Sequence, residues 1–530
     1  MKGPRNARNV RKVWNEQNER RSPRRMLAAG AGHLGAQTES VYQLRGRFLT
    51  YMLGTALLAM AAAGALFALY AYVLGESVQG FLAVLGVAFP VGALLRLRGS
   101  PNAEPSPREA LGSVLLTWLV MPAVAGLPYL LAGGFGPIDA FFEAMSGFTT
   151  TGATTITHLA SVATSLLMWR ALSQWVGGVG IVVMFVAVFP QLAIAGRQLF
   201  FAEAPGAYQE RLAPRLRSTA ALVVGVYASL TLLAALAFAL AGMSPCDAVA
   251  HALASLSAGG FSPVPLGMSG YGAAAQWVAV VFMLLAGVSF PLLYRAVSGQ
   301  PRAILRSAEL RAYLLIVLGA GLALALLMRA EFGSGDALRH GLFQAVSVVT
   351  TTGFASDDFT RWGQPAQALI VLLLFVGGSA GSASGGVKVA RWLIIVKQSV
   401  REVRRALHPR AVMPVRVGDR VVPEEVMRSV VAFLTLYLAL FVTGTVTLVL
   451  LGEDLQTAFT AAIACLGNTG VGLGQLGPMG TFESLHPLSR VMLTFLMYAG
   501  RLEGVTVFVV SDSSFWRRPR RRRVLPASPR

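Results

Sequence analysis

Charged side chains are scarce in this sequence. Asp, Glu, Lys and Arg make up 13% of its 530 residues, whereas hydrophobic residues make up 55%. Soluble domains typically carry about 25% charged residues. Together with a mean hydropathy of +0.60, this scarcity excludes an ordinary soluble enzyme. Cysteine is rarer still, and the two cysteines exclude a disulfide framework.

The usual arrangements of catalytic and metal-binding residues are also missing. The six histidines are scattered, without the His-Glu-x-x-His spacing of zinc sites, and the sequence has no nucleophile elbow. An intramembrane enzyme would need paired ionisable residues within its spans, and only Arg501 and Glu503 qualify. We therefore expect no enzyme and no cofactor in this chain.

Long apolar stretches are abundant instead. A helix needs about 20 apolar residues to cross the hydrocarbon core of a bilayer. The sequence predicts an all-α polytopic membrane protein. We therefore expect the lipid bilayer to be one of its partners. The expected spans are 48–74, 79–95, 110–132, 164–190, 218–242, 274–297, 310–328, 367–395, 429–451 and 489–511.

The excess of positive charge fits a membrane protein. A net charge of +20 in a soluble protein would suggest nucleic acid as a partner. Here the basic residues gather in alternate connections and in the tails 1–47 and 512–530, as the positive-inside rule describes. We expect a multi-pass protein of the cytoplasmic (inner) membrane with both termini in the cytoplasm, no cleaved signal peptide and no nucleic-acid partner. The basic residues elsewhere are Arg170, Arg329, Arg339, Arg361, Arg490 and Arg501.

Four connections on the opposite side share one pattern. Each has an acidic residue, then an apolar run too short to span a bilayer, then a string rich in Thr, Ser and Gly. Such short runs suit re-entrant segments. We therefore expect four repeats of helix, pore helix, extended loop and helix around a central pore, behind two leading helices. The expected divisions are 48–109 for the leading helices, then 110–190, 191–297, 298–398 and 399–511 for the repeats, the last including a cytoplasmic loop.

The acidic residues at the starts of the short runs have a simpler explanation than ion binding. We expect them to cap pore helices, because carboxylates satisfy free backbone N–H groups at helix N-termini. These residues are Asp139, Asp247, Asp336 and Asp454.

The four strings align on a glycine and predict a potassium site. Glycine reaches positive φ at little cost, and rings of backbone carbonyls replace the hydration shell of potassium in channel filters. The alternative is that they are ordinary turns between spans. The predicted filter residues are Thr150, Thr151 and Gly152; Ala258, Gly259 and Gly260; Thr351, Thr352 and Gly353; and Asn468, Thr469 and Gly470.

Two further features lie within predicted spans. The run 377–386 contains Gly377, Gly378, Gly381, Gly385 and Gly386, and so many glycines predict an unwound helix, although a packing kink would also fit. Arg501 lies near the middle of the last expected span. An intramembrane arginine indicates function by default; the alternative is a salt bridge with Glu503 or capture by backbone carbonyls.

The motifs SGFTTTGATT, LSAGGFSP, VVTTTGFAS and GNTGVGLG, with QWVGGVGIVV, GGSAGSASGGVKVAR and GRLEG, resemble those of the Trk/Ktr/HKT superfamily of potassium transporters, closest to its TrkH branch. The resemblance covers about residues 48–512. It implies potassium uptake through a four-repeat selectivity filter, an intramembrane gating loop at 377–386 with Arg501 beside it, a homodimer, and a cytosolic TrkA-like nucleotide-binding ring. The alternatives are a sodium- or proton-coupled potassium symporter and an alternating-access cation transporter.

Overall fold

The computed structural model describes residues 46–100, 107–184, 212–418 and 420–503. Within them the chain is helical apart from loops and one short hairpin, β1 (Arg416–Val417) paired antiparallel with β2 (Arg420–Val421). The predicted all-α class is confirmed. Both terminal tails, for which a cytoplasmic location is predicted, lie outside the described residues.

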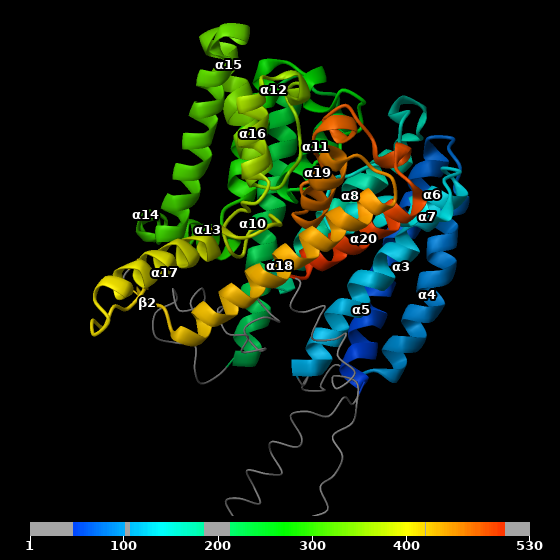
Figure 1. The fold of residues 1–530 in the computed structure, drawn as a ribbon. Helices are drawn as coiled ribbons and strands as arrows, with labels where there is room; N and C mark the ends of the chain where they lie inside the picture. The colour runs from blue at the N-terminus through cyan, green and yellow to red at the C-terminus, as the bar shows by residue number, and fades with distance from the viewer. Residues whose placement is uncertain (1–45, 101–106, 185–211, 419, 504–530) are drawn as a thin grey trace, which may run out of the picture.

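Two leading helices, α3 (Arg47–Val73) and α4 (Gln79–Arg98), form a hairpin at one edge of the molecule (Figure 1). Their apolar side chains pack against the first repeat in a separate core cluster around Phe67, Phe81 and Trp169. The Trp169 indole N–H donates to the Ala125 carbonyl at 3.0 Å. The hairpin is thus attached to the outside of the first repeat.

The four repeats follow in chain order. The first has α5 (Pro107–Ala125), α6 (Leu127–Leu131), pore helix α7 (Pro137–Phe148) and α8 (Thr164–Val183); the second has α10 (Leu212–Leu240), pore helix α11 (Pro245–Leu256), α12 (Ala273–Ala286) and α13 (Phe290–Val297). The third has α14 (Arg302–Arg306), α15 (Ala308–Val349), α16 (Gln364–Leu373) and α17 (Val389–Leu407); the fourth has α18 (Glu424–Leu450), pore helix α19 (Leu455–Leu466) and α20 (Pro487–Arg501). Single 3-10 turns lie at Leu159–Ser161, Gly267–Gly270, Phe359–Arg361, Gly474–Leu476 and Phe482–Ser484.

The pore helices are short for a physical reason. Three of them have 12 residues, which is about 18 Å of helix, well under the thickness of a bilayer core. The third is the last part of α15, which bends at Gly333 (φ 74°). Proline at the first turn starts α7 and α11, where its missing N–H costs nothing.

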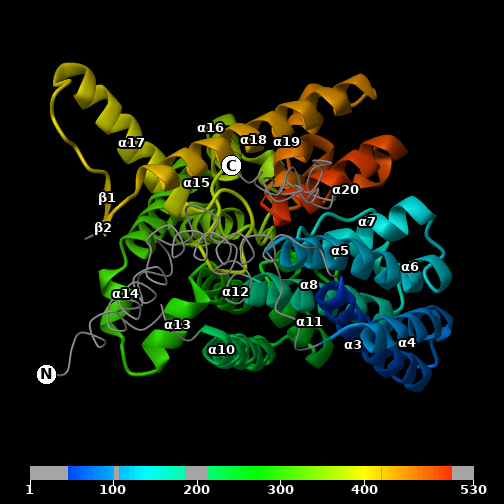
Figure 2. The same cartoon turned by 90° about the horizontal axis from the view of Figure 1, so that it is seen from below.

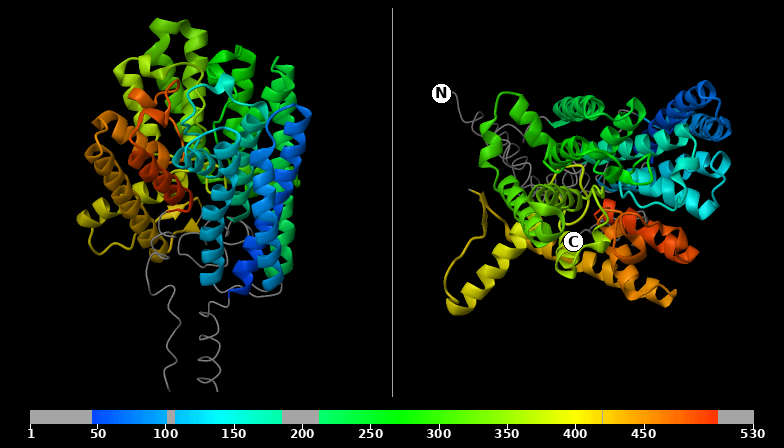
Figure 3. Two further views of the ribbon diagram at one scale, coloured as in Figure 1. Left: turned by 90° about the vertical axis from the view of Figure 1, so that its right-hand side faces the viewer. Right: turned by 90° about the horizontal axis from the view of Figure 1, so that it is seen from above.

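The repeats close into a ring (Figure 2). Each of α7, α11 and α19 packs on the α-helix that follows it in its own repeat, which is α8, α12 or α20, and α7 also packs on α20 of the fourth repeat. The same circular arrangement is visible from above in Figure 3. The four extended strings after the pore helices therefore meet near the centre.

Exposed apolar side chains cover the outside of the ring. On α3, α10 and α15, leucines such as Leu66, Leu232 and Leu315 are more than 60% exposed. Seven described helices are long and apolar enough to cross a membrane, and a bent pair adds an eighth. A soluble monomer would not present so large an apolar surface, so this surface faces lipid.

Several expected spans differ from the observed helices. The span expected at 274–297 is broken, because α12 and α13 meet at 98°. The span expected at 367–395 is interrupted between Leu373 and Val389, which confirms the unwound stretch predicted from the glycine run. The last described helix, α20, ends at Arg501, and residues 504–511 of the expected last span lie outside the described residues.

Candidate functional site

The four glycine-containing strings adopt one backbone conformation. In each, the residue two positions before the glycine and the glycine itself have positive φ. The first set is Thr150, Ala258, Thr351 and Asn468, with φ between 51° and 57°; the second is Gly152, Gly260, Gly353 and Gly470, with φ between 74° and 84°. Positive φ is rare for a β-branched residue such as threonine. Such strain persists only where the surroundings impose it, and it clusters at functional sites.

The glycines interlock around a closed circle. A Cβ added to any of them would come closer than 3.0 Å to a backbone carbonyl of the next repeat. Gly152 meets Gly259, Gly260 meets Thr352, Gly353 meets Thr469, and Gly470 returns to Thr151. No side chain fits at these four positions. We call the twelve predicted filter residues, three from each string, the filter ring.

Side-chain hydroxyl and amide groups stabilise the filter ring through hydrogen bonds. The Thr149 and Thr151 hydroxyls are 2.8 Å apart, as are those of Thr350 and Thr352. Asn468 links two repeats, because its Nδ2 donates to the Thr151 hydroxyl and to the Met497 carbonyl, both at 3.0 Å.

Gln174 holds the second string at two points. Its Nε2 donates to the Gly259 carbonyl at 2.5 Å, and its Oε1 accepts from the Phe261 N–H at 3.1 Å. The side chain is fully buried in α8. Gln174 thus fixes the backbone on either side of Gly260. A carbonyl has two lone pairs, so this bond leaves one acceptor site on Gly259.

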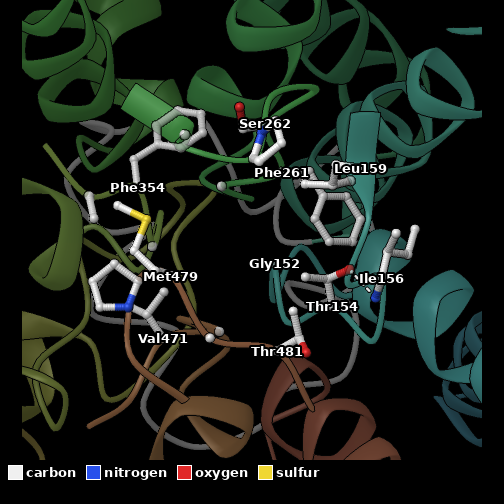
Figure 4. A pocket seen from close by; sticks show the side chains of 18 of the residues that line it. Gly152, Thr154, Ile156, Leu159, Phe261, Ser262, Phe354, Val471, Met479 and Thr481 are labelled. Atoms are coloured by element: carbon white, nitrogen blue, oxygen red, sulfur yellow. Dashed lines mark hydrogen bonds between the residues drawn. The ribbon is translucent and has the colours of Figure 1, made fainter. Parts of the chain in front are cut away.

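A cavity of about 160 Å³ opens above the filter ring. All four ring glycines line it, together with outer-loop residues such as Phe261, Phe354 and Met479, whose side chains surround the opening in Figure 4. Among the described residues that line it, Arg170 is the one charged residue, and none carries a carboxylate. The cavity therefore gives access to the ring.

The glycine run lies against the filter ring. Its Gly385 N–H donates to the Thr351 hydroxyl at 2.6 Å, and a Cβ on Gly385 would collide with the Gly467 carbonyl and Asn468. The segment also folds on itself, since the Gly377 N–H donates to the Val387 carbonyl at 2.9 Å. We call residues 377–388 the intramembrane loop.

The tip of this loop, residues 379–384, packs against the break between α12 and α13. The Ser379 and Ala383 N–H groups donate to the Gly287 and Ala286 carbonyls, at 2.9 and 3.2 Å. In the other direction, the Phe290 N–H donates to the Gly381 carbonyl at 3.0 Å. The Ala380 N–H donates to the Glu309 carboxylate at 2.7 Å. Backbone groups freed by the broken helix are thus satisfied by the loop, as they must be at membrane depth.

Arg501 reaches the same loop. It is 3% exposed, and its Nη1 donates to the Ala383 carbonyl at 2.9 Å. Its Nε and Nη2 find no acceptor among the described residues. Lys388 adds a second buried basic side chain, whose Nζ donates to the Ser384 carbonyl. The structure therefore brings the predicted gate residues together.

The salt bridge considered for Arg501 is not observed. The Glu503 carboxylate instead pairs with Arg391 of α17 at 2.6 Å. Glu503 has φ 56°, which turns the chain directly after α20. This pair ties the end of α20 to the helix that follows the intramembrane loop.

The predicted helix caps are only partly right. Asp454 is the N-cap of α19 and accepts from the Thr457 N–H at 3.0 Å. The N-cap residues of α7 and α11 are Gly136 and Ser244, and the aspartates lie in the first turn as the third helical residues. There Asp139 pairs with Arg490 of α20. Asp336 lies within α15 and pairs with Arg339 at 3.0 Å.

Sequence reasoning missed three buried polar residues beside the ring. Glu143 was not singled out from the sequence, and Arg170 was named only among the basic residues elsewhere, yet the two form a buried ion pair. Gln174 was noted only as part of a motif. Glu143 lies inside an apolar pore-helix sequence, and that context was the available signal. Among the described residues, no three His, Cys, Asp or Glu side chains gather as a metal site.

A family model described as "TrkH: Cation transport protein" matches residues 117–317 and 328–517. The chain belongs to the TrkH family of cation transport proteins. Among its relatives is the Trk system potassium uptake protein TrkH of Vibrio parahaemolyticus, 37% identical over 420 residues, which are 77% of this chain and 86% of the relative. TrkH of Escherichia coli K12 is 34% identical over 451 residues, 83% of this chain and 92% of the relative.

The fold agrees with this family. The crystal structure of the potassium transporter TrkH from V. parahaemolyticus superposes with a TM-score of 0.81 and 32% identity, over 89% of this chain and all of that one. The arrangement of four pore repeats behind two leading helices is confirmed. Membership of the TrkH family makes this chain a multi-pass membrane transporter and not an enzyme.

Proposed function

We propose that this TrkH-family chain carries potassium into the cell through the filter ring. The observation that carries the proposal is the closed circle of contacts in which each ring glycine abuts a carbonyl of the next repeat. Four strings held in register can present carbonyl oxygens to one ion, and carbonyls replace the water of a weakly hydrated cation. The relatives that carry the name potassium uptake protein support the same substrate. Potassium is the substrate, and the chain needs no cofactor.

Replacing a ring glycine tests the filter. Gly260→Ala would force a Cβ against the Thr352 carbonyl at φ 75°, so the ratio of potassium to sodium uptake into liposomes should fall. Gly272→Ala is the matched control, because its Cβ meets nothing within 4 Å and its φ is −65°. An unchanged ratio in folded Gly260→Ala protein would contradict the filter assignment.

The intramembrane loop and Arg501 form the gate in this proposal. The loop contacts the ring through Thr351, and Arg501 holds the loop at Ala383. A guanidinium stays charged in any protein environment, so it repels a potassium ion leaving the ring. The gate opens when the loop withdraws.

In this proposal the protein lies in the inner membrane with both termini in the cytoplasm, and it forms a homodimer. A cytosolic TrkA-like ring binds nucleotide and acts on the gate. The TrkH family and the basic cytoplasmic connections support it. Co-purification from the native host tests the partner. Recovery of fully active, nucleotide-insensitive protein without any nucleotide-binding subunit would contradict this part of the proposal.

Coupling to sodium or protons is tested in the same liposomes. A conducting pore takes up potassium down its own gradient with no second gradient imposed. A symporter would require one, and an alternating-access transporter would rock around a midplane site. The four re-entrant pore helices favour the pore.

A further inference from the structure

A buried ion pair stands directly behind the first two filter strings. Glu143 of α7 and Arg170 of α8 are 0% and 2% exposed, and Arg170 Nε lies 3.3 Å from Glu143 Oε2. Burying two charges is costly unless each finds further hydrogen bonds. Their additional partners therefore indicate what the pair holds in place.

Those partners are the outer ends of two filter strings. Glu143 Oε1 accepts from the Thr154 hydroxyl at 2.6 Å and from the Thr155 N–H at 2.5 Å. Arg170 Nη2 donates to the same Thr154 hydroxyl at 3.1 Å, and Nη1 lies 3.4 Å from the Ser262 carbonyl of the second repeat. The guanidinium also lies over the Phe261 ring, 4.0 Å from its centroid. One ionic cluster thus joins the strings that follow Gly152 and Gly260.

The second repeat has a neutral version of the same tie. Glu143 lies nine residues before Gly152 and contacts the residue two positions after it; His251 and Ser262 occupy the corresponding places around Gly260. His251 Nε2 lies 3.1 Å from the Ser262 hydroxyl. In the third repeat the corresponding residues are Gln344 and Ala355, and the Gln344 amide finds no partner among the described residues. The fourth repeat has Ala461 and Gly472 at these places, so among the four repeats only the first has a carboxylate there.

We propose that the Glu143–Arg170 pair is a positioning element for ion selectivity, which sets the spacing of the first two filter strings. The proposal rests on the filter function proposed above. Neither residue belongs to the filter ring. They act through Thr154, Thr155 and Ser262, which continue directly from the ring glycines. Loss of the pair frees the outer ends of two strings while the glycines themselves remain intact.

The test separates position from charge. Glu143→Gln leaves an uncompensated positive charge near the cavity, and Arg170→Gln leaves a negative one, so a purely electrostatic role predicts opposite effects on potassium uptake. A positional role predicts that both lower the potassium-to-sodium uptake ratio, by about tenfold (~1.4 kcal/mol). The double variant, which leaves no net charge, should lose the ratio as well. A wild-type ratio in the folded double variant would overturn the proposal.

A second variant covers the case in which those proteins fail to fold. Thr154→Val removes the hydroxyl shared by Glu143 and Arg170 without leaving a buried charge unpaired, and it should also lower the ratio. Thr154→Ser retains the hydroxyl and should rescue it. A wild-type ratio for folded Thr154→Val would refute the positioning role. Arg361→Gln, which removes the exposed Arg361–Asp358 pair, is the control for loss of an external charge.

Gly152→Ser distinguishes the proposed filter function from the positioning role of the Glu143–Arg170 pair. If Gly152→Ser loses selectivity while Glu143→Gln and Thr154→Val keep it, the filter stands and the positioning role falls. If the wild-type protein itself does not prefer potassium, the proposed function falls.

Discussion

Arg501→Ala should raise the basal flux of potassium. Arg501 Nη1 is 2.9 Å from the Ala383 carbonyl of the intramembrane loop, so an ion that displaced the loop there would pass within about 4 Å of the guanidinium. At an effective dielectric constant of about 20, the repulsion at that distance is about 4 kcal/mol. That energy lowers local ion occupancy by a factor on the order of 10³. The lost hydrogen bond, worth ~1.5–3 kcal/mol when one partner is charged, also loosens the loop.

The assay is rubidium uptake into liposomes by purified protein without any cytosolic subunit. Arg501→Lys is the matched control, because it keeps the charge and should keep basal flux low. Thermal unfolding in detergent checks that the variants fold. If well-folded Arg501→Ala protein showed unchanged or reduced flux, Arg501 would have no role in the gate, although the filter ring would survive.

Four other predictions follow from the contacts. Deleting residues 379–384 removes the loop tip docked on the α12–α13 break and should raise basal rubidium flux; wild-type flux would contradict the gate. Glu309→Ala removes the acceptor of the Ala380 N–H and should raise basal flux to a smaller extent, whereas lower flux would refute a holding role. Asn468→Ala breaks the link from the fourth string to Thr151 and should lower the potassium-to-sodium uptake ratio; a wild-type ratio would show that the link is dispensable. Trp169→Phe removes the hydrogen bond to the Ala125 carbonyl and should lower the free energy of unfolding by about 1 kcal/mol, measured by thermal unfolding. The potassium-to-sodium uptake ratio should stay at the wild-type value, and a changed ratio would contradict a purely structural role for Trp169.

The parts of the site that were predictable from sequence are those governed by local backbone chemistry. Gly152, Gly260, Gly353 and Gly470 recur after short apolar runs, and positive φ with no room for a Cβ is what the structure requires there. The unwound stretch within 367–395 was also predictable, because a glycine-rich run disfavours a helix wherever it lies.

Contacts between distant segments were not predictable. Glu143 and Arg170 are 27 residues apart, on different helices. The apolar sequence around Glu143 indicates burial, but nothing local identifies Arg170 as its partner. The break at 287–289 did carry a local signal, since proline lies in the first turn of α13. The apolar residues on both sides of the break nevertheless predict one continuous span. For Arg501, the apolar sequence that continues beyond it suggested a longer helix than the described α20.

The central claim is that the filter ring selects potassium. Its most direct test is the initial rate of uptake of potassium, rubidium, sodium and lithium into liposomes that contain purified wild-type protein, each cation measured alone at the same concentration. The interlocked glycines and their neighbouring carbonyls predict that potassium and rubidium enter much faster than sodium and lithium. Equal rates for sodium and potassium would contradict the account.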